Sequence, residues 1–261
     1  MLSKRWTKKE ENKLKHLYLK TNMPVEEICR ILHRTPPAIQ IRLKLAGIKK
    51  RRFPIRTKHP TKITPALARI HAHICGDGCL YAFREKDCYG PWAKYRKNPN
   101  YYRTRYIACY TNTNPELLKE FRQDIKEVFG IHGKKLRNFD IRMNSKRVWQ
   151  LLKEMGAGNS HEWFIPKSII QGLPNVKKNW VRAFFDDEAY FNDGGRIRVK
   201  CVNKKGLQQI TEMLNEFVPC HLLPKRGSYW GNTYCININK KDTPKFFSKI
   251  GSLRYQGNKK V

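Results

Sequence analysis

Two short stretches of the same design constrain this chain more than any other feature. Residues 70–78 read Ile-His-Ala-His-Ile-Cys-Gly-Asp-Gly, and residues 181–189 read Val-Arg-Ala-Phe-Phe-Asp-Asp-Glu-Ala. Each stretch has the pattern of a short helix, places an acid (Asp77 or Glu188) at its end, and precedes a polar sequence with strand character. A motif that occurs twice predicts two related structural units.

An internal repeat supports the same division. Residues 141–156 align with residues 236–251 without a gap, and identical residues include an aligned pair of lysines, Lys146 and Lys241. Each half then reads as an acid-ended helix, two strands, a helix, two strands and a last helix. Self-similarity of this kind indicates one supersecondary unit used twice.

The segments between these landmarks predict amphipathic helices and half-buried strands. Asn114 caps a predicted helix in the first half, and a matching helix in the second half is predicted from the apolar spacing of Leu207, Ile210, Met213, Leu214 and Phe217. After the second acid, Arg196, Arg198 and Lys200 alternate with apolar residues, which predicts an antiparallel sheet with a cationic exposed face. The predicted fold class is therefore α+β.

The charge of the chain indicates a polyanionic partner. Lys and Arg total 54 against 21 Asp and Glu, a formal net charge of +33. Nucleic acid is the first candidate, because basic residues recur among aromatic ones. An anionic membrane surface is second, although no basic amphipathic helix or lipidation signal is present. A basic face that is merely solvated is the remaining alternative.

The first half carries extra length at residues 84–105, which mixes basic and aromatic side chains and ends with Arg103 and Arg105. An extended basic hairpin of this type is suited to contact DNA beyond the stretch that the two sheets would cover. The alternative is a tip that is disordered when no DNA is bound.

Residues 1–48 predict a separate domain of three short helices. Thr7 and Glu10 have capping-box spacing, Pro36 opens a third helix through Ile39, Leu43 and Leu45, and Gly47 ends it. Together with Trp6, these residues resemble the Myb/SANT-like form of the helix-turn-helix family. The resemblance implies that the third helix enters the major groove. The residues that it would offer there are Gln40, Arg42 and Lys44.

A small helical module that does not touch DNA is the alternative for this domain. Residues 49–62 are rich in Lys and Arg and are broken by Pro54 and Pro60, so they cannot form one long helix. We interpret them as a basic linker that follows phosphates, with a solvated linker as an equal alternative.

The positions of the two acids favour a metal site. A carboxylate at the C-terminal end of a helix lies at the negative pole of the helix dipole. Two such ends brought together repel each other and DNA phosphates, unless divalent cations compensate. Mg²⁺ (or Mn²⁺) binds carboxylate and water oxygens as ligands and leaves coordination positions for a substrate phosphate. Ala72, Gly76 and Ala183 are small enough to let two helices approach closely.

Residues 63–261 resemble the LAGLIDADG homing endonuclease family in its single-chain form with two motifs. The resemblance rests on the two nine-residue stretches, the doubled unit order and Phe164-Ile165-Pro166-Lys167 before the second motif. It implies two pseudo-symmetric αββαββα units with saddle-shaped antiparallel sheets, spanning 63–158 and 175–261 and joined by a linker at 159–174.

The family's functional residues carry over to particular positions. The eighth motif position, the metal-binding carboxylate, falls on Asp77 and Glu188, and the preceding residues, Gly76 and Asp187, adjoin the metals. Basic residues that assist catalysis map to Lys146 and Lys241, with the adjacent Lys240 as an alternative to Lys241. The sheets are expected in the major groove and the acids at the minor groove, where both strands are cut.

We therefore predict a monomeric, Mg²⁺-dependent DNA endonuclease with a long asymmetric double-stranded target. The alternatives are an intron RNA maturase and a non-cleaving DNA-binding regulator on the same fold. A transcription factor that uses only the N-terminal helices leaves the repeated acids unexplained. Two departures distinguish the halves: Ala189 replaces the usual final glycine, and Asp187 either crowds the helix interface or adds a carboxylate near the metals.

No apolar segment is long enough to cross a membrane, and a charged N-terminus predicts an intracellular protein of the cytoplasm or nucleoid. The eight cysteines form no Cys-x-x-Cys pair, so reduced and mostly buried thiols are expected. His71, His73, Cys75 and Cys79 resemble transition-metal ligands only superficially, and we expect packing roles for them.

Overall fold

A computed structural model describes residues 6–19, 25–48, 58–86, 102–135, 139–191, 194–228 and 231–255. The chain divides into two compact units, Met1–Ile55 and Arg56–Val261, which are treated separately below. Most of the predicted basic linker (49–57) and the tip of the predicted basic hairpin (87–101) lie outside the described residues.

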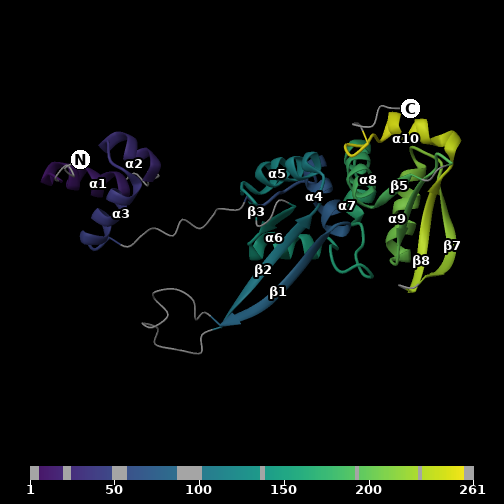
Figure 1. The fold of residues 1–261 in the computed structure, drawn as a ribbon, viewed down its shortest axis with the longest axis horizontal. Coiled ribbons are helices and arrows are strands. Elements are labelled where there is room, and N and C mark those ends of the chain that lie inside the picture. Colours follow the sequence, from purple (N-terminus) through teal and green to yellow (C-terminus); the bar gives the residue numbers. More distant parts are fainter. Residues whose placement is uncertain are drawn as a thin grey trace. The chain divides into compact units, whose positions relative to one another are not determined.

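The N-terminal unit contains the three predicted helices: α1 (Lys8–Leu19), α2 (Val25–Leu32) and α3 (Pro36–Leu45), as Figure 1 shows. The capping box is present, because Thr7 N donates to Glu10 Oε2 (2.9 Å) and Glu10 N donates to Thr7 Oγ1 (3.2 Å). Six apolar side chains form its core: Leu14, Tyr18, Ile28, Leu32, Ile39 and Leu43. Leu45, expected among the apolar residues of α3, is instead 70% exposed.

The larger unit contains the predicted αββαββα order twice. The first copy comprises α4 (Pro65–Cys75), β1 (Gly78–Lys86), β2 (Tyr102–Thr111), α5 (Pro115–Phe129), β3 (Lys134–Lys135), β4 (Asp140–Met143) and α6 (Lys146–Glu154). The second comprises α8 (Pro174–Glu188), β5 (Ala189–Phe191), β6 (Ile197–Cys201), α9 (Lys204–Asn215), β7 (His221–Ser228), β8 (Gly231–Ile238), the short 3₁₀ turn η2 (Lys240–Asp242) and α10 (Thr243–Lys249).

The two sheets have the same antiparallel topology. Their strand orders are β1-β2-β4-β3 and β5-β6-β8-β7, so the strand that follows each acid-ended helix lies at an edge. The repeated blocks occupy equivalent places, because each runs from within the last strand (β4 or β8) to just after the end of the last helix (α6 or α10). Both blocks end on a glycine with positive φ, Gly156 (99°) and Gly251 (80°).

Helices α4 and α8 lie side by side at the junction of the two copies (Figure 1). Thr64 caps α4 by accepting from Leu67 N, and Pro65 occupies the first turn. Nearly every residue of α4 is buried, and one continuous core includes side chains from both copies. The copies therefore form one folded body, in which the ends of α4 and α8 are held firmly.

The segment between the copies contributes to this core as well. It contains the short helix α7 (Lys167–Ile170), and Trp163 and Ile165 are each 1% exposed. Gln209 on α9 hydrogen-bonds both the N–H and the C=O of Ile165, so this segment is fixed to the second copy.

Within the described residues, no helix is both long and apolar enough to cross a membrane. The cysteines in the same part of the chain are all free thiols, and Cys75, Cys109 and Cys220 are buried.

Candidate metal and DNA site

The two motif acids lie at the ends of the packed helices, but the two helices end differently. Helix α4 stops at Cys75, and Gly76 and Asp77 form a turn into β1. Gly78 is required there, because a Cβ atom would lie 2.6 Å from the Cα atom of Ile74. Helix α8 continues through Glu188 and enters β5 directly.

The missing final glycine of the second motif is accommodated by this direct exit from α8. Ala189 has φ −80° and ψ 146°, an extended conformation that any residue adopts, and its side chain is buried. The second copy therefore needs no glycine at this position.

Asp77 is an exposed residue whose carboxylate accepts a hydrogen bond from Asn112 Nδ2, at 2.8 Å from Oδ2. Partial burial and the neighbouring charge of Asp187 raise the pKa of Asp77 to about 6, although the bond from Asn112 opposes this shift. Asn112 is itself oriented, because its Oδ1 accepts from the backbone N–H of Asn114.

The pKa of Glu188 is shifted further than that of Asp77. Burial, together with the charges of Asp77 and Asp187, raises the pKa of Glu188 to about 7. Among the described residues, no side chain or backbone group hydrogen-bonds or ion-pairs with its carboxylate. A half-buried acid with this environment is suited to a cation, which would remove the repulsion among the carboxylates.

Asp187 has a different environment, because its carboxylate is fully buried and already bonded. His73 Nδ1 donates to Oδ2 (2.8 Å), while Tyr110 Oη (2.7 Å) and Asn112 Nδ2 (3.3 Å) donate to Oδ1. Its Cβ and Oδ2 atoms lie 3.1 Å from where a Cβ of Gly76 would be, so the side chain fills the space left by that glycine. Asp187 does not crowd the helix interface.

The Asp187 carboxylate also determines the direction in which the pKa of His73 is shifted. The His73 side chain is completely buried. Burial alone would lower the pKa of His73, but the charge and hydrogen bond of Asp187 outweigh it, so the pKa is raised above its ordinary value. The Nε2 atom of His73 has no hydrogen-bond partner among the described residues. The network ties α4 and β2 of the first copy to α8 of the second.

The neighbouring His71 is held in another way. Its Nε2 donates to the carbonyl of Met155 (3.0 Å), and its Nδ1 accepts from Trp180 Nε1 (3.0 Å). Burial lowers the pKa of His71 to about 4, so the ring is neutral. Cys75 Sγ lies 3.7 Å from His71 Nδ1, and in the described part of the chain no three His, Cys, Asp or Glu side chains form a metal-ligating cluster.

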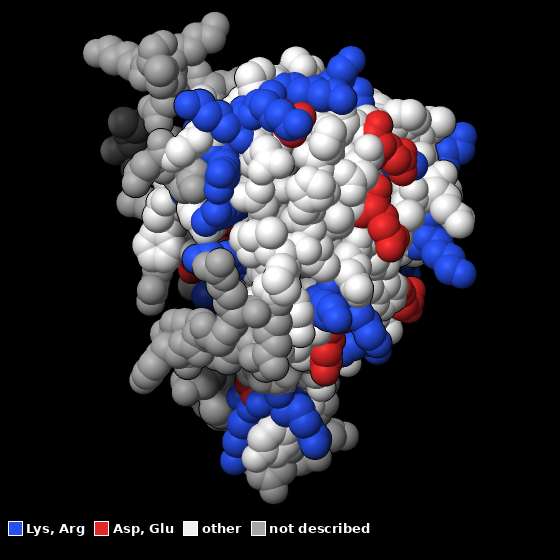
Figure 2. Space-filling view, turned by 90° about the vertical axis from the view of Figure 1, so that its right-hand side faces the viewer, with Lys and Arg blue, Asp and Glu red and all other residues white. Residues whose placement is uncertain are grey.

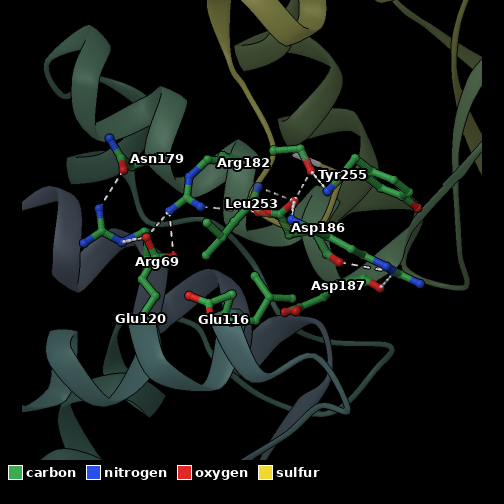
Figure 3. Close-up of polar contacts among 12 residues, drawn as sticks. Arg69, Glu116, Glu120, Asn179, Arg182, Asp186, Asp187, Leu253 and Tyr255 are labelled. Atoms are coloured by element: carbon green, nitrogen blue, oxygen red, sulfur yellow. Dashed lines mark hydrogen bonds and ion pairs between the residues drawn. The ribbon is translucent and has the colours of Figure 1, made fainter. Parts of the chain in front are cut away.

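Partly buried ion pairs fix α4, α5 and α8 relative to one another behind this site (Figure 3). Arg69 on α4 donates to both carboxylate oxygens of Asp124 on α5 and to Asn179 on α8. Arg182 on α8 donates to both oxygens of Glu120 at 2.7 Å. Bidentate pairs of this kind restrict the angle between helices as well as their distance.

The C-terminal segment after α10 also reaches the site, through Asp186. The buried carboxylate of Asp186 accepts from Ser252 Oγ (2.5 Å) and from the backbone N–H groups of Leu253 and Arg254. Figure 3 shows the contacts of Asp186 with Arg182 and Leu253. Arg254 then donates through Nη1 to the carbonyls of Asp186 and Asp187, at 3.2 Å each.

A depression of about 280 Å³ lies beside Asp77, at the ends of α4 and α8. Its lining includes Asp77, Thr111, Asn112, Asp187 and Arg254. One acid of the proposed metal pair, an amide and an arginine therefore face a common space at the end of the helices.

The two lysines expected to assist catalysis lie elsewhere. Lys146 begins α6, is exposed, and has its Nζ 5.4 Å from the centre of the Tyr106 ring. Lys241 is exposed in η2. Neither residue lines the depression. Their role in catalysis stays a prediction.

The cationic strand β6 has the expected alternation. Ile197 and Val199 are buried, while Arg196 and Lys200 are exposed and Arg198 is half-buried. Arg198 Nε donates to Asn237 Oδ1 (3.1 Å), and Lys200 Nζ lies over the ring of Tyr190. On the face drawn in Figure 2, Lys and Arg side chains are widespread, while most acidic ones gather toward one edge.

In the first sheet, Arg103 and Arg105 both donate through Nε to Glu85 Oε1, at 2.5 and 2.6 Å. Their side chains remain about two-fifths exposed, at 39% and 41%. This cluster retains a net positive charge at the edge of the predicted DNA surface.

In the N-terminal unit, Gln40 and Lys44 are exposed on α3, as DNA contact requires. Arg42 instead forms an ion pair with Glu11 and lies over the ring of Trp6, at 5.9 Å from its centre. Base contact by Arg42 would require these interactions to break.

Three residues of the site were not identified from the sequence: Asn112, Arg254 and Asp186. Asn112 had a usable signal, because it stands two residues before the helix cap Asn114 and just after a strand. Arg254 and Asp186 had none, since their relation depends on contacts between segments far apart in the chain.

No protein-family model matches this chain. It is similar to the crystal structure of I-DmoI in complex with DNA and Mn, with a TM-score of 0.54 and 19% identity, covering 73% of this chain and 98% of that one. A structure of mesophilic variants of the homing endonuclease I-DmoI gives the same TM-score and identity, over 72% of this chain and 90% of that one. Full-length DUF199/WhiA from Thermatoga maritima is more distant, with a TM-score of 0.45 and 12% identity over 77% and 60%.

The likeness to I-DmoI establishes the fold: residues of the larger unit adopt the LAGLIDADG fold, as predicted. Among curated proteins, the replication factor C small subunit of Thermococcus kodakarensis is 25% identical over 183 residues, which is 66% of this chain and 20% of that protein. The chain thus spans about a fifth of the length of that relative.

Proposed function

We propose that this chain is a LAGLIDADG-type homing endonuclease, a site-specific enzyme that hydrolyses phosphodiester bonds in both strands of duplex DNA. Asp77 and Glu188 would hold the divalent cations, and the two sheets would bind a long asymmetric target in the major groove. The chain would act as a monomer, because it contains both copies of the unit.

One observation carries this proposal. Two carboxylates extend from the ends of adjacent helices, both have raised pKa values, and Glu188 has no described partner. A protein gains no stability from such an arrangement, since burial and like charges both oppose ionisation. Selection for a bound cation explains it.

The donor set suits Mg²⁺ or Mn²⁺. Hard oxygen ligands from one or two carboxylates, with waters and a substrate phosphate, are the environment that Mg²⁺ prefers. A bound divalent cation would supply activated water and stabilise the leaving oxygen. Asp187 would support the metal site indirectly, since His73, Tyr110 and Asn112 bind its carboxylate and Arg254 Nη1 donates to its backbone carbonyl.

DNA binding is supported by the net charge of +33 and by the exposed cations of β6 and of the first sheet. Neutralisation of many phosphates releases counterions, so affinity should fall steeply as salt increases. The N-terminal unit would add contacts through α3, with Gln40 and Lys44 toward the bases.

Cleavage selection tests the proposal. The protein is incubated with Mg²⁺ and a randomised duplex library at low salt, and cut ends are sequenced. We expect one asymmetric site with staggered cuts, which Asp77→Asn and Glu188→Gln each abolish while DNA binding persists. Glu154→Gln, an exposed glutamate on α6, is the matched control and should cut normally.

Tight DNA binding without any cleavage would refute the nuclease and favour a regulator. Selective binding of structured intron RNA with no DNA cleavage would favour a maturase.

A further inference from the structure

Arg254 is an exposed cation that lies against the acid site without belonging to either motif. It follows the last helix of the second copy, and it lines the same depression as Asp77 and Asn112.

The backbone around this arginine is held by several contacts. Asp186, which is 0% exposed, accepts from Ser252 Oγ and from the N–H groups of Leu253 and Arg254. Tyr255 Oη donates to the carbonyl of Ala189 at 2.9 Å. The segment is therefore attached to the end of α8 on both sides of Arg254.

The guanidinium group is only partly used by these contacts. Nη1 donates to the carbonyls of Asp186 and Asp187, while Nε and Nη2 donate to no atom of the described residues. A planar guanidinium with free N–H groups, fixed at one edge and exposed at the other, matches the geometry of a phosphate.

The first copy has no equivalent cation. Extending the repeat alignment beyond Gly156 and Gly251 places Asn159 opposite Arg254. The motif residue that anchors the segment also differs, since Cys75 stands where Asp186 does. The arginine and its anchor thus occur together, and on one side of the pseudo-symmetric site only.

We infer that Arg254 binds the scissile phosphate of one DNA strand, the strand whose phosphate enters the depression beside Asp77. The inference rests on the nuclease function proposed above. A role limited to capping the C-terminal carbonyls of α8 is the competing explanation.

Strand-resolved cleavage distinguishes the two explanations. A supercoiled plasmid carrying the selected site is cut under single-turnover conditions with Mg²⁺, and each strand's rate is measured by primer extension. Removal of a donor to a reacting oxyanion typically slows a reaction by about 100-fold or more. We therefore expect Arg254→Gln to slow one strand by at least about tenfold and the other by less than about threefold, so that nicked circles accumulate.

Arg254→Lys keeps the charge without the fork of donors, and we expect it to restore the slow strand only partly. Lys249→Gln removes an equal charge from an exposed position on α10 and should cut both strands at wild-type rates. Binding provides a second measurement: Arg254→Gln should reduce the slope of log affinity against log salt by about one, whereas Lys249→Gln should not.

The inference would be overturned if Arg254→Gln cut both strands at wild-type rates, or if it slowed both strands by the same factor. A large loss of thermal stability with an unchanged ratio of strand rates would show that the residue only caps α8. If the wild-type protein cuts neither strand, the proposed function fails instead, and the two failures are distinguishable.

Discussion

Replacing Glu188 with glutamine is expected to stabilise the metal-free protein at pH 8, although it abolishes the proposed activity. In the folded state the pKa of Glu188 is raised from 4.5 to about 7, by burial and by the charges of Asp77 and Asp187. The ionised form is therefore unfavourable in the folded protein, and glutamine removes that charge while keeping the size of the side chain.

The magnitude follows from the pKa. A rise from 4.5 to about 7 corresponds to about 3 kcal/mol for carrying the charge in the folded state. Because the carboxylate is partly in contact with solvent, screening reduces this to about 1–2 kcal/mol. For a unit of about 200 residues, the expected rise in Tm is about 2–8 °C.

The effect must depend on pH with a particular sign. Below pH 4.5 the carboxyl is protonated in both the folded and the unfolded state, so the variant gains nothing. As pH rises from 4.5 to about 7, the unfolded state loses its proton first, and the wild type loses stability relative to the variant. Above pH 7 the difference is constant.

Thermal unfolding followed by circular dichroism from pH 4 to pH 9, with a chelator present, measures this difference. Mg²⁺ should then raise the Tm of the wild type more than that of the variant, since a bound ligand stabilises the folded state. Glu154→Gln, at an exposed position on α6, controls for loss of one negative charge. A variant that is no more stable than the wild type at pH 8, or a gain that is constant with pH, would refute the electrostatic argument.

Three further outcomes are expected. Gly78→Ala should lower the free energy of unfolding by about 2–3 kcal/mol in urea titrations, because its Cβ would lie 2.6 Å from a backbone atom of α4, whereas Gly158→Ala, with nothing nearer than 3.9 Å, should be near neutral. Asp187→Ala should cost about 3 kcal/mol at pH 7, because His73 loses its buried partner; unchanged stability would contradict this ion pair. Residues 56–261 alone should bind the target more weakly in gel shifts yet cut DNA that is already bound, and loss of that cutting would oppose a purely binding role for the N-terminal unit.

Much of the fold was predictable because local signals agree with one another. The internal repeat marked two equivalent blocks, and the side-chain cap of Asn114 and the apolar spacing of α5 and α9 located the helices. Alternation along β6 also located its buried face. These signals depend on neighbours in sequence, so they survive without knowledge of tertiary contacts.

The site was predictable only where the motif itself carries the residue. Asp77 and Glu188 were assigned by position, but the partners of Asp187 come from α4 and β2, and no periodicity relates it to His73 or Tyr110. The two candidate lysines were chosen by alignment, yet the cation in the depression is Arg254, which follows the aligned block. Charge density made every lysine an equal candidate, and three-dimensional position was needed to choose among them.

The differences between the two copies are coupled to each other. Asp187 fits because Gly76 lacks a side chain, and its charge is stabilised by His73 of the first motif. Asp186 in turn anchors the segment that carries Arg254. A change in either motif therefore requires a matching change in the other copy or in the C-terminal segment. Divergence of this kind is open to a chain that holds both copies, whereas a symmetric dimer must repeat each change twice. Under the inference drawn above, this coupling would give an asymmetric site, in which Arg254 contacts one DNA strand and no equivalent residue contacts the other.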